Sequence, residues 1–306
     1  MSSQEAVARR ISALSLAASA ALAAIKIGVG LSAGSTAVVS DGVESASDCL
    51  TSGLVLLGLW IASKPSDSDH PYGHGRFEIL TGLTIGVLLA VIGTGICLQS
   101  LLQRNAIHPL AAYAIWPLLL SISVKGLFAS AKFRAGKRTG SSSLSADAWH
   151  DLLDLSSGVV ALAGVSLALL DPVYRTADHW AGFGVGLIVI AAGVGVARQT
   201  VLHLVDTMPD AKQMSEIRHA ALCVPGAKGV EKCFARKTGL RYHVDLHLEV
   251  DPQLTVRESH DIATAVRIAV KTNVAWVEDV LVHVEPYEGH ATPMAAAGTA
   301  GTQPKS

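Results

Sequence analysis

The chain has 306 residues, of which 50% are hydrophobic and only 16% are charged. Soluble domains with a similar apolar fraction carry about 25% charged residues, so this chain lacks charge rather than having an excess of apolar residues. Most of its charges lie outside a few long apolar segments, which argues against a soluble enzyme and for a polytopic membrane protein with a polar appendage. A formal net charge of −1 provides no basic surface, so nucleic acid is not an expected partner.

In chain order, the first feature is a series of six segments long enough to cross a lipid bilayer, which takes about 20 apolar residues as helix. They cover residues 11–33, 37–63, 78–102, 110–131, 142–170 and 179–199. Residues 1–10 precede them as a cytoplasmic tail, and residues 11–204 are expected to form an all-α membrane domain of six transmembrane helices. The first segment is longer than the core of a signal peptide and contains Lys26, so we interpret it as a membrane span.

The loop charges predict the orientation of these helices. The N-terminus, the second and fourth loops and the end of the last span carry nine basic residues: Arg9, Arg10, Lys64, Arg76, Lys132, Arg134, Lys137, Arg138 and Arg198. The opposite loops carry only Arg104 and Arg175. By the positive-inside rule the first set faces the cytoplasm, which predicts a multi-pass protein of a bacterial inner membrane with both termini cytoplasmic.

The composition changes after the last span, where residues 207–288 are expected to fold into a small cytoplasmic domain. Their pattern predicts a helix over 211–222, strands over 229–236 and 240–250, a helix over 255–271 and a strand over 278–285. This α-β-β-α-β order is typical of an α+β domain of ferredoxin-like character. The second strand alternates apolar residues with His243, Asp245, His247 and Glu249, so its outer face is rich in potential ligands. Residues 289–306 are low in complexity and are predicted to be disordered.

An acidic pattern is repeated inside two of the predicted spans. The second span carries Asp41, Glu44 and Asp48, and the fifth carries Asp147, His150 and Asp154. Offsets of three and seven residues place each set on one helix face. Because a charged side chain at the bilayer centre costs at least about 2.5–3.5 kcal/mol, these residues need partners.

Two such helices can together bind one metal ion, and the four predicted ligands are Glu44, Asp48, His150 and Asp154. Three carboxylates and one imidazole in a roughly tetrahedral arrangement suit a divalent transition metal, and this set admits zinc, iron(II), cobalt and manganese. The ligands must lose their protons to bind, so metal entry releases protons, which is the chemistry of an antiporter. The remaining two acids, Asp41 and Asp147, lie nearest the starts of their spans. A role in the site and an ordinary position, at the membrane interface or in polar packing between helices, explain them equally well.

These features resemble the cation diffusion facilitator family of divalent-metal/proton antiporters. Three passages carry the resemblance: the segment from Asp41 to Asp48, the loop from Lys64 to Arg76 with its Asp-His-Pro-Tyr-Gly-His-Gly run, and the His150-x-x-x-Asp154 pair. The resemblance covers all six spans and the C-terminal domain. It implies a homodimer, a transport site between the second and fifth spans, and a metallochaperone-like cytoplasmic domain.

One residue departs from the family pattern. Glu44 stands where the family usually has His or Asp, so the predicted site is harder and richer in oxygen. Zinc remains the metal that the family implies, but the oxygen-rich ligand set makes iron(II), manganese and cobalt stronger candidates for the substrate.

The second cytoplasmic loop contains three residues of ligand type, Asp67, His70 and His74, around a turn favoured by Pro71 and Gly73. Their spacing alone is equally consistent with a solvated polar loop. The resemblance implies a second metal site at these residues.

Two charges flank the membrane domain: Arg76 opens the third span and Asp206 follows the sixth. The resemblance implies that they form a charge interlock between protomers. Without the resemblance, Arg76 is an ordinary positive-inside anchor and Asp206 a linker charge.

In the C-terminal domain the resemblance implies further metal ligands, namely Glu231, His247, His260, His283 and Glu285. Glu231 stands where the family has a histidine, which leaves open whether a complete binuclear centre forms. Cys233 follows two residues later and is expected on the same strand face. Each of these residues is otherwise consistent with an ordinary surface side chain. Zinc or another divalent transition metal is the expected ligand of this domain as well as the substrate.

We therefore predict a transporter and not an enzyme, which exports cytosolic divalent metal in exchange for protons by alternating access. Zinc is the first candidate substrate, with iron(II), manganese, cobalt or cadmium as alternatives. The competing hypothesis is a metal-sensing or structural membrane protein that binds metal without transporting it. An intramembrane hydrolase is disfavoured because no His-Glu-x-x-His motif occurs and the Gly-x-Ser-x-Gly match at residues 30–34 lies at a span end.

Overall fold

The computed structural model describes residues 3–103, 110–139, 142–239 and 241–288, apart from the side chains of residues 3–13, 135–139, 142–151, 153 and 172. The chain divides into two compact units, one within residues 1–60 and 80–200 and the other within residues 61–79 and 201–306. The predicted disordered tail, residues 289–306, lies outside the described residues and stays a prediction.

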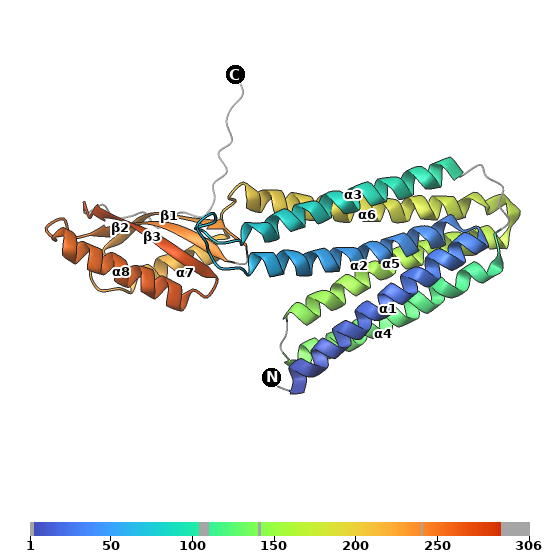
Figure 1. Cartoon of the computed structure of the whole chain (residues 1–306), viewed down its shortest axis with the longest axis horizontal. Coiled ribbons are helices and arrows are strands. Elements are labelled where there is room, and N and C mark those ends of the chain that lie inside the picture. The colour runs from blue at the N-terminus through green and yellow to red at the C-terminus, as the bar shows by residue number, and fades with distance from the viewer. Residues whose placement is uncertain (1–2, 104–109, 140–141, 240, 289–306) are drawn as a thin grey trace, which may run out of the picture. The chain divides into compact units, whose positions relative to one another are not determined.

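Six long helices carry the predicted spans (Figure 1). They are α1 (Ser3–Ala33), α2 (Thr36–Ala62), α3 (Arg76–Gln103), α4 (Ile115–Thr139), α5 (Ser142–Leu170) and α6 (Thr176–Leu204). Among the described residues, five helical stretches are long and apolar enough to cross a membrane, and α5 adds a shorter apolar stretch, Asp154–Leu170. These helices confirm the predicted helical membrane domain. Because α1 begins at Ser3, the helix includes most of the predicted N-terminal tail.

Helices α3 and α6 run side by side through small residues (Figure 1). A Cβ atom added to Gly93 would lie 2.8 Å from the carbonyl oxygen of Gly186, and one added to Gly86 would lie 2.6 Å from the backbone nitrogen of Ala197. Only glycine allows the two backbones to approach this closely, as is usual where membrane helices pack.

The acidic helix α2 is anchored at its start by α6. The Asp178 carboxylate of α6 accepts hydrogen bonds from the Ser35 hydroxyl at 2.5 Å and from the backbone N–H of Thr36 at 2.7 Å. First-turn N–H groups have no partner within their own helix and favour a negative side chain. The same end of the bundle is packed by a buried apolar cluster that includes Val38, Leu118 and Val165.

The C-terminal residues form the predicted α-β-β-α-β domain. Its elements are α7 (Ala211–Leu222), β1 (Gly229–Lys237), β2 (Tyr242–Val250), α8 (Val256–Asn273) and β3 (Val277–Pro286). The strand order is β1-β2-β3, with β1 antiparallel and β3 parallel to β2. The helix α8 begins with a capping box in which Thr255 and Glu258 bond each other's backbone N–H groups. The predicted ferredoxin-like class is confirmed.

Alternation in β2 places the apolar residues inside and the ligand types outside. Val244, Leu246 and Leu248 are buried, and they pack against Ile217 of α7 and Val266 of α8. Both helices therefore cover one face of the sheet, and the opposite face is left to the polar side chains of β2 and β3.

A bulge in β1 overturns the expectation that Cys233 shares a face with Glu231. The register pairs Val230 with Leu248 but Cys233 with Leu246, so β1 contains one extra residue between these pairs. Cys233 is 4% exposed and lies in the core, whereas Glu231 is exposed. Burial raises the pKa of the Cys233 thiol to about 11, so this residue is a core thiol and not a neighbour of the outer-face ligands.

Candidate metal sites

The facing sides of α2 and α5 bring the predicted transport carboxylates together. Asp41 and Glu44 are buried, and Glu44 lies within electrostatic range of Asp41, Asp48 and Asp154. The side chains of His150 and Asp147, two further residues of the predicted pattern, lie outside the described residues. The described carboxylates thus form one group, of which Asp41 and Glu44 are buried and Asp48 and Asp154 half-buried, and its role as the transport site stays a prediction.

One carboxylate oxygen of Glu44 has no hydrogen-bond donor in the part of the chain that the structure describes. Its Oε2 atom is buried and has no hydrogen-bond partner among the described residues. The carboxyl group is hydrogen-bonded to Ser157 of α5. Because a buried acceptor without a partner is unfavourable, this oxygen is suited to bind a cation or carry a proton.

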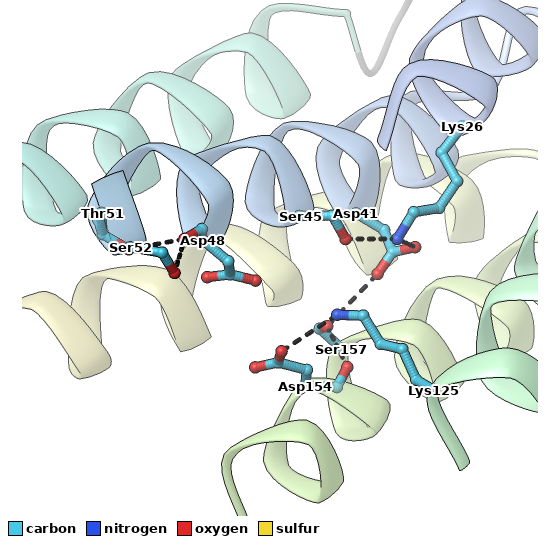
Figure 2. Close-up of polar contacts among 9 residues, drawn as sticks. All are labelled: Lys26, Asp41, Ser45, Asp48, Thr51, Ser52, Lys125, Asp154 and Ser157. Atoms are coloured by element: carbon cyan, nitrogen blue, oxygen red, sulfur yellow. Dashed lines mark hydrogen bonds and ion pairs between the residues drawn. The ribbon is translucent and has the colours of Figure 1, made fainter. Parts of the chain in front are cut away.

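Two lysines from other helices neutralise part of this anionic group (Figure 2). Lys26 of α1 is fully buried and donates to Asp41 Oδ2 at 2.8 Å and to the Ser45 hydroxyl at 2.6 Å. Lys125 of α4 donates to Asp154 Oδ2 at 3.1 Å. Sequence reasoning missed both partnerships. The available signal was that an ammonium group inside an apolar span needs a counter-charge.

Hydroxyl groups of α2 and α5 form hydrogen bonds with the acidic residues of this group. The Ser157 hydroxyl lies 2.8 Å from the Asp154 carbonyl oxygen and 3.4 Å from Asp41 Oδ1 (Figure 2). On α2, the Ser52 and Thr51 hydroxyls donate to the backbone carbonyl of Asp48, at 2.8 and 3.1 Å. These two bonds on α2 end on the backbone carbonyl of Asp48 and not on its carboxylate.

The described charges of this site do not cancel. The ammonium groups of Lys26 and Lys125 face four carboxylates, those of Asp41, Glu44, Asp48 and Asp154. With every group ionised, the described set carries two surplus negative charges. Unbalanced negative charge is unfavourable in a low-dielectric interior, and one divalent cation would neutralise it.

The loop between α2 and α3 brings Asp67, His70 and His74 together, with one ligand atom of each within 4.8 Å of the others. The backbone N–H of His70 donates to Asp67 Oδ1 at 2.7 Å, and this hydrogen bond is the main reason why the pKa of Asp67 is lowered. His74 Nδ1 lies 3.1 Å from the carbonyl oxygen of Pro65, which can only accept a hydrogen bond, so Nδ1 carries the proton that it donates there. Nε2 then faces Asp67 Oδ2 at 3.5 Å. Gly73 adopts a positive φ of 79°, as the turn requires.

On the outer face of the C-terminal sheet, His247, His283 and Glu285 form a second three-residue group within 4.8 Å. His247 Nδ1 lies 2.6 Å and His283 Nε2 lies 3.7 Å from Glu285 Oε1. Neighbouring β2 and β3 pair His247 with His283 directly. A hydrogen bond to Glu231, followed by the interaction with His247, lowers the pKa of Glu285, so Glu231 of β1 joins this group.

His260 is the one predicted ligand of this domain that the structure places apart. It lies on α8 and lines a cavity of about 380 Å³ together with His243, Asp245 and Arg267. Among the described residues, the three-residue group of the outer face does not include it.

Arg76 and Asp206 form an ion pair within one chain, with 3.8 Å between Arg76 Nη2 and Asp206 Oδ1. Both side chains are exposed, and Asp206 has a positive φ of 57° just after α6 ends. The backbone N–H of Thr207 donates to the Leu202 carbonyl at 3.1 Å, which closes the helix end. The interlock between protomers implied by the resemblance stays a prediction.

Comparison with known proteins shows which family the chain resembles over most of its length. Residues 12–205 match the family described as the cation efflux transmembrane domain, and residues 209–287 match the cytoplasmic domain of cation efflux proteins. The chain is 34% identical to metal tolerance protein C1 of Arabidopsis thaliana, over 90% of this chain but only 62% of that protein's length. It is 29% identical to the manganese efflux system protein MneP of Bacillus subtilis, over 94% of this chain and 98% of MneP.

Among solved structures, a variant of the C-terminal domain of MamM is 34% identical, over 25% of this chain and 94% of that domain, with a TM-score of 0.25. Variants of the MamM domain have also been solved in nickel and cadmium forms.

Proposed function

Because the chain belongs to the cation diffusion facilitator family, we propose that it exports a divalent metal from the cytosol in exchange for protons, at a site between α2 and α5. The ligands that we assign are Glu44, Asp48, His150 and Asp154. The observation that carries the proposal is the group of carboxylates that two lysines only partly neutralise.

Proton exchange follows from the chemistry of these ligands. The buried Oε2 of Glu44 is stabilised either by a proton or by a cation, because no donor among the described residues reaches it. A metal ion that enters from the cytosol displaces protons from the carboxylates, and protons replace the metal after the helices have opened to the other side.

The substrate is a divalent transition metal. Zinc is the metal that the family implies, and three carboxylates among the four assigned ligands favour harder ions more than a histidine-rich site would. MneP, which aligns over nearly its whole length, is named as a manganese efflux protein, and this supports manganese as the main alternative. Iron(II), cobalt and cadmium complete the set to be tested.

The remaining clusters regulate transport in this proposal. Metal bound at Asp67, His70 and His74, or at the outer face of the C-terminal sheet, would stabilise a homodimer and thereby shift the balance between inward- and outward-open states. The clusters face the cytosol if both termini are cytoplasmic, as the loop charges predict for an inner-membrane protein.

Uptake into liposomes tests the proposal. The purified protein is reconstituted with an imposed pH gradient, and uptake of zinc, manganese, iron(II), cobalt and cadmium is measured for wild type, Asp48→Asn and Asp154→Asn. Asp171→Asn is the matched control, because Asp171 is an exposed residue after α5 that caps the next turn. We expect uptake by wild type and the control, and a loss of at least about tenfold in both site variants. Equal uptake by all four proteins would contradict the site, and metal binding without uptake by wild type would favour a sensor.

A further inference from the structure

A lysine from α4 enters the carboxylate group that we assign to the metal. Lys125 Nζ lies 3.1 Å from Asp154 Oδ2, and the two side chains are only 8% and 13% exposed. Figure 2 shows the lysine pointing from α4 toward the acids of α2 and α5. Neither charge is well solvated, so each depends on the other for stabilisation.

The influence of Lys125 extends beyond this one contact. Its ammonium group interacts electrostatically with Asp48 and Asp41 as well as with Asp154. A divalent ion bound to Asp154 would therefore meet a fixed positive charge at the same oxygens. The metal ion and the Lys125 ammonium group would bind the same carboxylates, and two positive charges a few ångströms apart repel each other strongly in a low-dielectric site.

The second buried lysine, Lys26, has a structural role and serves as a comparison for Lys125. Lys26 is fully buried and is held by Asp41 and by the Ser45 hydroxyl, both one helix away on α2. Its acceptors are not among the assigned metal ligands. Lys125 differs because its hydrogen-bond acceptor, Asp154, is one of them.

We propose that Lys125 is a tethered counter-cation that binds Asp154 in the metal-free transporter and must leave this carboxylate before the metal is coordinated there. This inference rests on the proposed function. In the empty site Lys125 holds α4 against α5, and in the loaded site it weakens metal binding and so speeds metal release. Lys125 is thus a positioning residue that sets the affinity of the site.

Transport kinetics of the full-length protein in liposomes test the role of Lys125. Initial rates of zinc and manganese uptake are measured over a range of metal concentrations at one fixed pH. For Lys125→Met we expect KM to fall by about 10- to 100-fold and kcat to fall as well, because a competing charge is removed and release slows. Lys212→Met, at an exposed site on α7, is the control, and its KM is expected to stay unchanged.

A second variant keeps the outcome decisive. If Lys125→Met fails to fold, judged by its elution from a sizing column, Lys125→Arg decides instead. Its guanidinium group binds carboxylates in a bidentate manner, so KM should rise several-fold. An unchanged KM in the folded Lys125 variants would overturn the inference.

The two proposals fail in different ways. If Asp154→Asn transports as well as wild type, the transport site itself is wrong. If Asp154→Asn is inactive but the Lys125 variants retain the wild-type KM, only the role of Lys125 is wrong.

Discussion

Lys26 and Asp41 form a buried ion pair between α1 and α2, with 2.8 Å between Lys26 Nζ and Asp41 Oδ2 and side-chain exposures of 0% and 3%. Asp41 begins the acidic pattern of α2, and this pair gives it a structural partner on α1. Removing one member of a buried pair leaves the other charge unpaired, which is far more costly than the pair itself. Lys26 therefore ties the first helix to the helix that carries two of the assigned ligands.

Loss of the Lys26 ammonium should destabilise the protein strongly. We expect Lys26→Met to reduce stability by about 3–5 kcal/mol, and Lys26→Met combined with Asp41→Asn to recover most of that loss. The apparent melting temperature in detergent measures both effects. Lys212→Met, at an exposed site on α7, is the control and should leave it unchanged. A double variant that is no more stable than Lys26→Met would show that the pair does not act as a unit.

Glu44 should influence the choice of metal. Glu44→His restores one of the family's usual residues and exchanges an oxygen ligand for an imidazole. We expect the ratio of zinc to manganese uptake in liposomes to rise by about tenfold, since manganese prefers oxygen ligands. Glu44→Gln controls for loss of charge and should reduce uptake of both metals. A zinc-to-manganese ratio that is identical in wild type and Glu44→His would remove Glu44 from the ligand set.

The metal group on the outer face of the C-terminal sheet should depend on Glu285. Glu285→Gln removes the carboxylate that faces both His247 and His283. We expect isothermal titration of the full-length protein with zinc to lose one class of sites, or to show it weakened by about 10- to 100-fold. Glu278→Gln, an exposed residue on the same strand, should bind as wild type does. Unaltered titration of Glu285→Gln would mean that the group is only a surface hydrogen-bond network.

Low pH should reduce the stability of the C-terminal domain, because it protonates Asp279. Hydrogen bonds from Arg267 are the main cause that lowers the pKa of Asp279 to about 2. A carboxyl group with a lowered pKa stabilises the folded state above its unfolded pKa of about 3.9, and this contribution disappears as the pH falls toward 2. Because both partners are partly exposed, we expect it to amount to about 1–2 kcal/mol.

Hydrogen exchange of the β3 peptides in the full-length protein measures this contribution. Asp279→Asn should lose protection at pH 7, and its difference from wild type should shrink between pH 4 and pH 2. Glu278→Gln, which weakens an exposed pair with Arg241, should resemble wild type at every pH. A difference between Asp279→Asn and wild type that persists undiminished at pH 2 would exclude this pair as its source.

The sequence alone determined most of the secondary structure, because helix and strand periodicity are local properties. The predicted helix 142–170 coincides with α5, and the alternation predicted for residues 240–250 is that of β2. The repeated acidic offsets placed Asp41, Glu44 and Asp48 on one side of α2 for the same reason, since 3.6 residues complete a turn. Local pattern was also enough to pick out the loop residues Asp67, His70 and His74 as one group.

Only the tertiary structure decided which charges meet. Lys125 pairs with an acid 29 residues away and Lys26 with one 15 residues away, and no local period connects helices that pack through their sides. One extra residue in β1 reversed the alternation after Val230 and turned Cys233 into the core. The number of buried charges can be counted in the sequence, but their pairing depends on distances between elements, and these exist only once the helices have packed.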